Sequence, residues 1–215
     1  MTFQTMLATM AVGMLRTFGV FVLTLLGSLP LGMVVALLKK SRFALVRALV
    51  GAYISIMRGT PLMLQLLVWY FGPYYLFGWS ISGWRFPAIV LGFVLNYAAY
   101  FAEIYRGGIE SIPVGQHEAA VVLGYSRTQT FMRIVLPQVV KRIMPSVTNE
   151  VITLVKDTSL AFTLAYQEVF SLAKQISASQ TSFMPFLIAG VFYFVANYAV
   201  EFGMGLIEKV LDYYR

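Results

Sequence analysis

Long runs of apolar residues constrain this chain more than any other feature of its sequence. Only 12% of the 215 residues are charged and 59% are hydrophobic, whereas soluble globular proteins carry about 25% charged residues. A chain with so few charges must expose apolar surface to lipid. Because a transmembrane helix needs about 20 mostly apolar residues, we predict five. They cover about 16–38, 45–77, 87–105, 143–165 and 183–207.

The second of these segments is longer than one upright crossing requires, because a helix rises about 1.5 Å per residue and the apolar layer is about 30 Å thick. It contains the sequence Arg58-Gly59-Thr60-Pro61. Proline removes a backbone donor from a helix, and glycine loosens the backbone. We therefore predict a kink or a break near Gly59–Pro61.

The basic residues indicate how the five helices are oriented, because cytoplasmic loops are enriched in Lys and Arg. Eleven of the 16 basic residues fall in three segments. They are Lys39, Lys40, Arg42 and Arg47, then Arg106, Arg127, Arg133, Lys141 and Arg142, and finally Lys209 and Arg215. Two cytoplasmic segments must be separated by an even number of crossings. The first two segments therefore fit one crossing over 45–77 and one over 87–105. The prediction is an all-α integral membrane protein with its N-terminus outside and its C-terminus in the cytoplasm.

The longest polar segment, at about 106–142, lies between the third and fourth predicted helices, and we expect short cytoplasmic helices in it. Glu118, Ala119 and Ala120 favour a helix, and Gly124 ends or bends it. On this pattern alone, a solvated connector is favoured over a docking element for another protein.

A second short helix is expected at about 127–135 within the same segment. Ser126 is a suitable N-cap, because its hydroxyl can accept from a free amide of the first turn. Pro137 is expected to close this helix, since the residue before a proline disfavours helical geometry.

The spacing of this segment resembles the EAA loop of bacterial ABC importer permeases. Glu118-Ala119-Ala120 is followed after three residues by Gly124, and nine residues later by Ile134-x-Leu136-Pro137. Three more segments are similar to signatures of the polar amino-acid uptake family, the histidine-, glutamine- and arginine-type permeases. They are Arg58-Gly59-Thr60-Pro61-Leu62, the stretch from Asn96 to Ile109, and Lys156-Asp157-Thr158-Ser159-Leu160. The resemblance extends from about residue 20 to residue 210.

This resemblance implies a division of labour between several subunits. Two permease subunits, identical or homologous, would form a solute pathway in the bacterial inner membrane. Two cytoplasmic ATPase subunits would drive it, and an extracellular or periplasmic solute-binding protein would deliver the solute. The whole chain, 1–215, would be one permease domain. Its ATPase-coupling residues would be Glu118, Ala119, Ala120 and Gly124.

The sequence is consistent with a transport subunit that is not itself an enzyme. It has no Gly-x4-Gly-Lys-Ser/Thr phosphate loop, so ATP and Mg²⁺ would bind to the partner ATPase. With no cysteine and one histidine, His117, it offers no thiolate or histidine metal site. We expect no cofactor or metal in this chain.

The fourth predicted helix carries a concentration of polar residues. Ionisable side chains inside a membrane cost about 2.5–3.5 kcal/mol each on insertion scales, so they usually face a cavity or a partner. Glu150 and Asp157 are seven residues apart and lie within about 20° of each other on a helix. Asn149 and Lys156 form the neighbouring stripe, and Thr153 lies between the two.

A free amino acid is a zwitterion, so its site needs a cation and an anion. Lys156 and Asp157 supply that pair, and Glu150 could neutralise a cationic side chain. Asn96 could add an amide hydrogen bond, while Arg58 could bind a carboxylate or pair with Glu150. The predicted substrate-binding residues are Arg58, Asn96, Glu150, Thr153, Lys156 and Asp157.

Several alternatives remain open at this stage. The charges could be a buried ion pair of Arg58 with Glu150 or Asp157 that only fixes helix packing. The favoured solutes are arginine, lysine and histidine, with glutamine, glutamate or cystine as the alternative. A protein of another class, a small secondary transporter or channel, could use Glu150, Lys156 and Asp157 as an ion relay. An adjacent gene for an ATPase would favour the importer.

Overall fold

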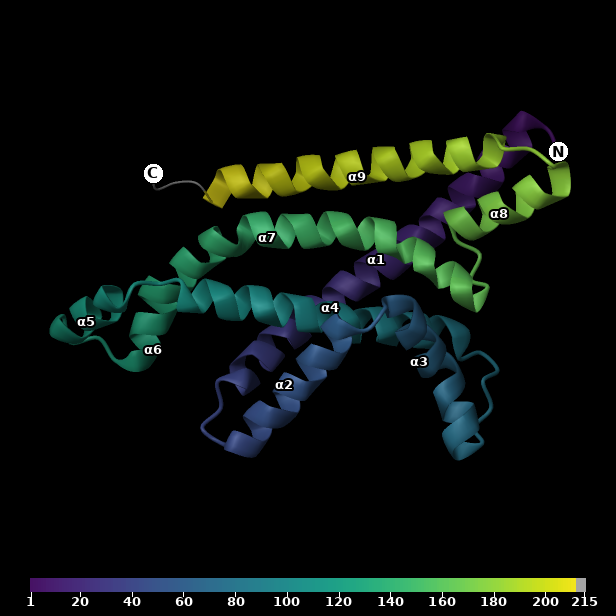
Figure 1. Cartoon of the computed structure of the whole chain (residues 1–215). Coiled ribbons are helices and arrows are strands. Elements are labelled where there is room, and N and C mark those ends of the chain that lie inside the picture. Colours follow the sequence, from purple (N-terminus) through teal and green to yellow (C-terminus); the bar gives the residue numbers. More distant parts are fainter. Residues whose placement is uncertain (212–215) are drawn as a thin grey trace.

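The computed structural model describes residues 1–211, and every regular element in that range is helical. Residues 212–215, among them Arg215, lie outside the described part. The elements run in the following order along the chain (Figure 1). They are α1 (Phe3–Lys39), α2 (Ala44–Gly59), α3 (Leu62–Phe77), α4 (Arg85–Glu110), α5 (Val114–Val122), α6 (Arg127–Thr130), the π-helical turn η1 (Phe131–Val135), α7 (Leu136–Asp157), the 3-10 segment η2 (Thr158–Leu164), α8 (Val169–Gln180) and α9 (Met184–Leu211).

The predicted break in the second apolar segment is confirmed. Helix α2 ends at Gly59 and α3 begins at Leu62, with Thr60 and Pro61 in extended backbone conformations. The ring of Pro61 has no N–H to continue the hydrogen-bond ladder of α2, so the chain leaves the helix there. Each half has 16 residues.

The fourth predicted helix, at about 143–165, differs from the structure at both ends. Helix α7 starts earlier, at Leu136, and ends at Asp157, after which the chain tightens into η2. The hydroxyls of Thr158 and Ser159 donate to the carbonyls of Val155 and Lys156, at 2.6 and 2.7 Å. Such local hydrogen bonds compete with the α-helical ladder, which accounts for the change of helix type.

The prediction that Pro137 closes a helix is wrong. Pro137 lies in the first turn of α7, directly after the π-helical turn η1. The π-helical turn η1 joins α6 directly to α7, so the chain remains helical from Arg127 to Asp157. The expected cap at Ser126 is confirmed: its hydroxyl accepts from the Gln129 amide, and the Gln129 side chain accepts from the Ser126 amide.

Helix α8 was not anticipated from the sequence. The side chain of Glu168 caps it, accepting hydrogen bonds from the amides of Phe170 and Ser171 at 2.7 and 2.6 Å. The Tyr193 hydroxyl of α9 donates to the same carboxylate at 2.9 Å. Glu168 is fully buried, so this carboxylate ties the start of α8 to α9 from inside.

Helix α4 runs through the centre of the molecule and packs against α1, α2, α3 and α7. Its large buried side chains include Phe93, Tyr97 and Phe101. Where α1 crosses α4, α1 presents the small residues Thr24, Ser28 and Gly32, spaced four apart on one face. Small residues at such a crossing let two helix backbones approach closely.

The outer surface of α9 is apolar. Phe194, Tyr198 and Phe202 are each more than half exposed. Among residues 1–211, three helices are long and apolar enough to cross a membrane, namely α1, α4 and α9. Helices α2 and α3 are shorter, and α7 carries five charged residues: Lys141, Arg142, Glu150, Lys156 and Asp157.

The close crossing of α1 and α4 yields a stability prediction at Gly32. A Cβ there would lie 2.8 Å from Phe101 Cβ and 3.1 Å from the Ala98 carbonyl oxygen. We expect Gly32→Ala to cost about 1–3 kcal/mol by overpacking, which lowers the melting temperature by about 2–10 °C. Thermal unfolding in detergent, followed by tryptophan fluorescence, measures this.

Gly19→Ala on the same helix is the matched control for that substitution, because no atom lies within 4 Å of the new Cβ. It should leave the melting temperature unchanged or raise it slightly. Equal effects of the two substitutions would contradict the close crossing.

Candidate solute site and coupling loop

Two adjoining cavities lie between α4, α7 and the break that separates α2 from α3. The first, here named the break cavity, has a volume of about 360 Å³ and is lined in part by Asn96, Glu150, Thr153 and Asp157. The second, here named the Arg58 cavity, has a volume of about 570 Å³ and is lined in part by Arg58 and Glu103. Tyr100 and Glu150 line both cavities.

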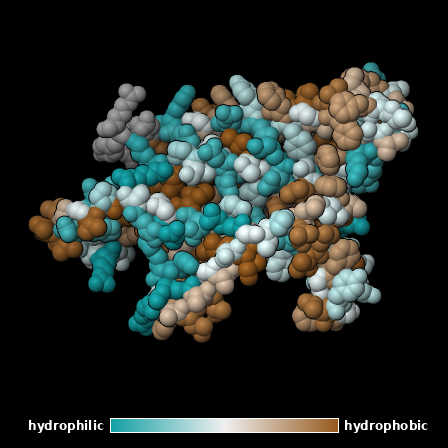
Figure 2. Space-filling model, in the orientation of Figure 1, coloured by the Kyte–Doolittle hydropathy of each residue, from teal (hydrophilic) through white to brown (hydrophobic). Residues whose placement is uncertain are grey.

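The structure brings most of the predicted substrate residues together. Four of the six line the break cavity, and Arg58 lines the cavity next to it. Lys156 lines neither; its side chain is exposed on α7. Figure 2 shows hydrophilic residues gathered across the middle of one face, over α4 and α7, with hydrophobic residues around them. The polar stripe predicted for α7 is therefore partly a cavity wall and partly an open surface.

Asp157 has a partner that the sequence did not indicate. The hydroxyl of Tyr97 on α4 donates to Asp157 Oδ2 at 2.7 Å. Tyr97 is almost fully buried, so the bond holds the carboxylate in a fixed place at the end of α7. The hydroxyl of Thr153 donates to the Asn149 carbonyl, at 2.9 Å, which leaves its oxygen free to accept another hydrogen bond.

Asn96 binds the backbone next to the break between α2 and α3. Its Nδ2 donates to the Met57 carbonyl at 2.9 Å and to Gln65 Oε1 at 3.0 Å. Gln65 in turn donates to the carbonyls of Met57 and Thr60. Gln65 was missed at the level of sequence, although a single amide in the apolar run of α3 is the signal that could have revealed it.

Arg58 pairs with a residue that the sequence analysis did not select. Its Nη1 lies 3.7 Å from Glu103 Oε2, and its guanidinium lies 5.2 Å from the centre of the Tyr100 ring. Arg106 also binds the Glu103 carboxylate, at 2.7 Å. The ion pair of Arg58 is thus with Glu103, and not with Glu150 or Asp157 as one alternative had it. The spacing of seven residues from Asn96 to Glu103 on α4 could have indicated this shared face.

The polar segment at about 106–142, here named the coupling loop after its predicted role, lies at one end of the molecule, where α4 ends and α7 begins (Figure 1). Glu118 and Ala119 are exposed on α5, and Ala120 is fully buried. Gly124 follows the helix with φ +75°, a left-handed conformation that favours glycine. The Tyr125 amide then donates to the Ala120 carbonyl. A short helix that ends just before Gly124 is confirmed, but it begins at Val114, four residues before the predicted start at Glu118.

The two ends of the coupling loop are bonded to each other. An Arg142 Nη1 donates to the Ser111 carbonyl, which links the start of α7 to the end of α4. Within the loop, a hollow of about 400 Å³ lies between α5 and the α6–η1 segment, lined by His117, Tyr125 and Phe131 among others.

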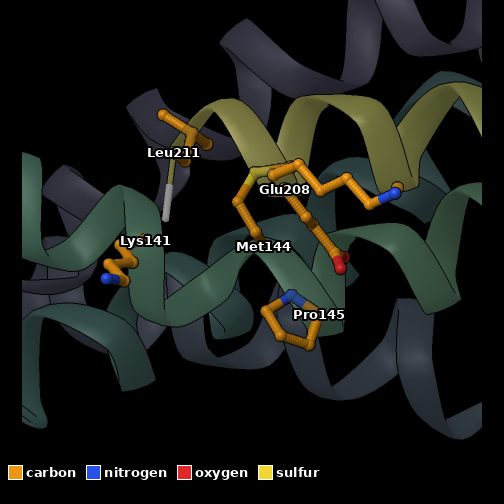
Figure 3. A pocket seen from close by; sticks show the side chains of 7 residues that line it. Lys141, Met144, Pro145, Glu208 and Leu211 are labelled. Carbon is orange, nitrogen blue, oxygen red and sulfur yellow. The ribbon is translucent and has the colours of Figure 1, made fainter. Parts of the chain in front are cut away.

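A further cavity of about 440 Å³ lies between α7 and α9. Figure 3 shows Lys141, Met144 and Pro145 of α7 opposite Glu208 and Leu211 of α9. It contains none of the predicted substrate residues. No group of three or more His, Cys, Asp or Glu side chains that could hold a metal ion occurs within residues 1–211.

Comparisons with known proteins show which family the chain belongs to. Residues 28–213 match the family of binding-protein-dependent transport system inner membrane components. The arginine transport system permease protein ArtQ of Bacillus subtilis is 37% identical over 200 residues, which is 93% of this chain and 90% of the relative. The putative glutamine transport system permease protein GlnP of Rickettsia felis is 35% identical, over 92% and 90% of the two chains.

The fold is also similar to a solved structure. The crystal structure of an amino acid ABC transporter with histidines contains a chain that is 30% identical and superimposes with a TM-score of 0.87. The match covers 97% of this chain and 98% of the other. The predicted membership in the ABC permease family is confirmed, and the chain is a transport subunit and not an enzyme. This protein belongs to the family of binding-protein-dependent transport system inner membrane components.

Proposed function

We propose that this chain is the permease subunit of an ATP-driven importer that carries amino acids inward, with a preference for arginine, lysine and histidine. The observation that carries this preference is the charge of the break cavity. Two carboxylates, Glu150 and Asp157, line it, and no Lys or Arg is among its described lining residues. A cavity of this charge favours a solute with more positive groups than a neutral zwitterion has.

The geometry suggests a role for each carboxylate. Asp157 is held by Tyr97 and is suited to the α-ammonium group that every amino acid carries. Glu150 lies two turns nearer the coupling loop and lines both cavities, so it is suited to a cationic side chain. Thr153 lies between them and can accept a hydrogen bond from the solute. Lys156 is exposed beside Asp157, and we propose that its ammonium group binds the carboxylate of the solute.

We also propose five crossings with an outside N-terminus. Helices α2 and α3 have 16 residues each. At about 1.5 Å per residue, either helix alone spans about 24 Å, which is less than the apolar layer of about 30 Å. Together, as one broken crossing, they are long enough. This arrangement puts α5 and α6 in the cytoplasm with the basic residues that flank them, in line with the positive-inside rule.

The remaining subunits follow from the family. We propose a second permease subunit, two cytoplasmic ATPases that bind ATP and Mg²⁺, and an external solute-binding protein, all at the inner membrane of a bacterium. Glu118 and Ala119 are exposed on α5 and would contact the ATPase. Buried Ala120 and left-handed Gly124 would shape the helix that presents them.

A second solute class is supported by one of the relatives, whose name assigns it to glutamine transport. Under this alternative, Glu150 would accept a hydrogen bond from an amide in place of a salt bridge from a cation. Glutamate and cystine belong to the same alternative. The match over residues 28–213 to a binding-protein-dependent transport component argues against a secondary transporter or channel.

The preference for cationic solutes predicts the behaviour of Glu150→Gln. Loss of a charge-assisted hydrogen bond costs about 1.5–3 kcal/mol, so arginine uptake should fall by about ten- to a hundredfold at low solute concentration. Uptake of labelled arginine is measured in proteoliposomes that contain the complete importer. Glu201→Gln, an exposed carboxylate on α9, is the control and should transport normally. Normal arginine uptake by Glu150→Gln at equal protein levels would refute the preference.

The coupling role predicts the behaviour of Glu118→Lys. We expect Glu118 to pair with a basic group of the ATPase. Reversing its charge should therefore weaken binding of the ATPase by about tenfold or more, because like charges would then meet at the contact. Co-purification of the ATPase with a tagged permease measures the binding. Glu201→Lys should retain the ATPase fully. If Glu118→Lys retains it as well, the assignment of this surface is wrong.

A further inference from the structure

The Arg58 cavity lies on the side of the break cavity that faces the coupling loop. Along α4, the lining residues step from Asn96 through Tyr100 to Glu103, toward the end of α4 where the coupling loop begins. Along α7, they step from Asp157 through Glu150 toward the start of that helix, where the loop ends. Since the two cavities share Tyr100 and Glu150, a solute that leaves the break cavity toward the coupling loop would enter the Arg58 cavity.

A cation of the protein, the guanidinium of Arg58, lies on the wall of the Arg58 cavity. The guanidinium of Arg58 lies over the face of Tyr100, at 5.2 Å, and beside the Glu103 carboxylate, at 3.7 Å. An aromatic face and a carboxylate are the two groups that bind a guanidinium or an ammonium most readily. Arg58 therefore fills the place that the side chain of a cationic amino acid would take.

The guanidinium of Arg58 can leave this position at little cost. The side chain of Arg58 is 43% exposed, and exposed ion pairs contribute little to stability. Glu103 would not be left unpaired, because Arg106 holds the same carboxylate by three hydrogen bonds, at 3.2, 3.2 and 2.7 Å. Arg58 is also in the last turn of α2, next to the break, where a small change in backbone direction moves the guanidinium.

We propose that Arg58 is a tethered competitor of the solute, and not a ligand for the solute carboxylate. Against Tyr100 and Glu103, it adds a positive charge beside Glu150 and occupies the two groups that would bind a cationic side chain in this cavity. A cationic solute that passes through the Arg58 cavity competes with Arg58 for these groups. This inference rests on the proposed preference for cationic amino acids and adds a residue that tunes specificity and release.

The experiment is equilibrium binding of labelled L-arginine to the complete importer, in lipid nanodiscs and without nucleotide. Arg58→Gln should bind arginine about tenfold more tightly. In the unchanged protein the guanidinium of Arg58 occupies the site most of the time, and the substitution removes this competition. The affinity for L-citrulline, whose side chain has nearly the same shape but no charge, should change by less than about twofold, because that side chain is not repelled by a cation. Arg58→Lys keeps the charge and should bind arginine as the unchanged protein does.

Arg47→Gln is the matched control. Arg47 is on the same helix, its guanidinium donates to the carbonyls of Ser41 and Arg42, and it lines neither cavity. Its loss should leave arginine affinity unchanged. Weaker or equal binding by Arg58→Gln overturns the proposal, and so does an equal gain for citrulline. Weaker binding is the result expected if Arg58 held the solute carboxylate.

Two further arms separate this proposal from the proposed function. If Glu150→Gln loses arginine binding while Arg58→Gln shows no gain, the cationic preference stands and the role of Arg58 falls. If the unchanged importer binds no cationic amino acid, both the cationic preference and the role of Arg58 are refuted. Arg58→Met, which keeps the aliphatic stem, carries the same expectation as Arg58→Gln. Failure of both variants to assemble would show that Arg58 holds the fold, and would overturn the proposal.

Discussion

The rest of the site depends on how the chain satisfies its backbone where α2 gives way to α3. A broken helix frees carbonyl groups that have no water to bind within a bilayer, and each unmet group is costly. Here the side-chain amides of Asn96 and Gln65 bind the Met57 carbonyl, and Gln65 also binds that of Thr60. These bonds anchor the break to α4. They fix the wall of the break cavity and place Arg58 at its edge.

Much of the architecture could be predicted from the sequence because apolar length and proline position are local properties. The break at Gly59–Pro61 and the cap at Ser126 followed from single residues with one dominant physical preference. The end of α7 did not, because it depends on the hydroxyls of Thr158 and Ser159 folding back onto the helix. Such bonds compete with the helix by small margins that a pattern of apolar residues does not reveal.

For the site, the sequence identified which residues are unusual but not which ones meet. Glu150, Thr153 and Asp157 were placed on one face of one helix by periodicity alone, and they do line one cavity. Partners on other helices were harder. Asp157 binds Tyr97 and Arg58 binds Glu103. These two pairings depend on how α4 is rotated against its neighbours, and that rotation is decided by tight packing such as that at Gly32.

The coupling loop has a consequence of a different kind. Its turns are closed by a capping box and by a left-handed glycine, and Arg142 binds its far end to Ser111 at the end of α4. A segment already held in one shape loses little conformational entropy when a partner binds it. We expect such a segment to bend little under load as well. A push delivered to α5 would therefore arrive at α4 and α7 as a displacement of whole helices, with little of the work absorbed in deforming the loop.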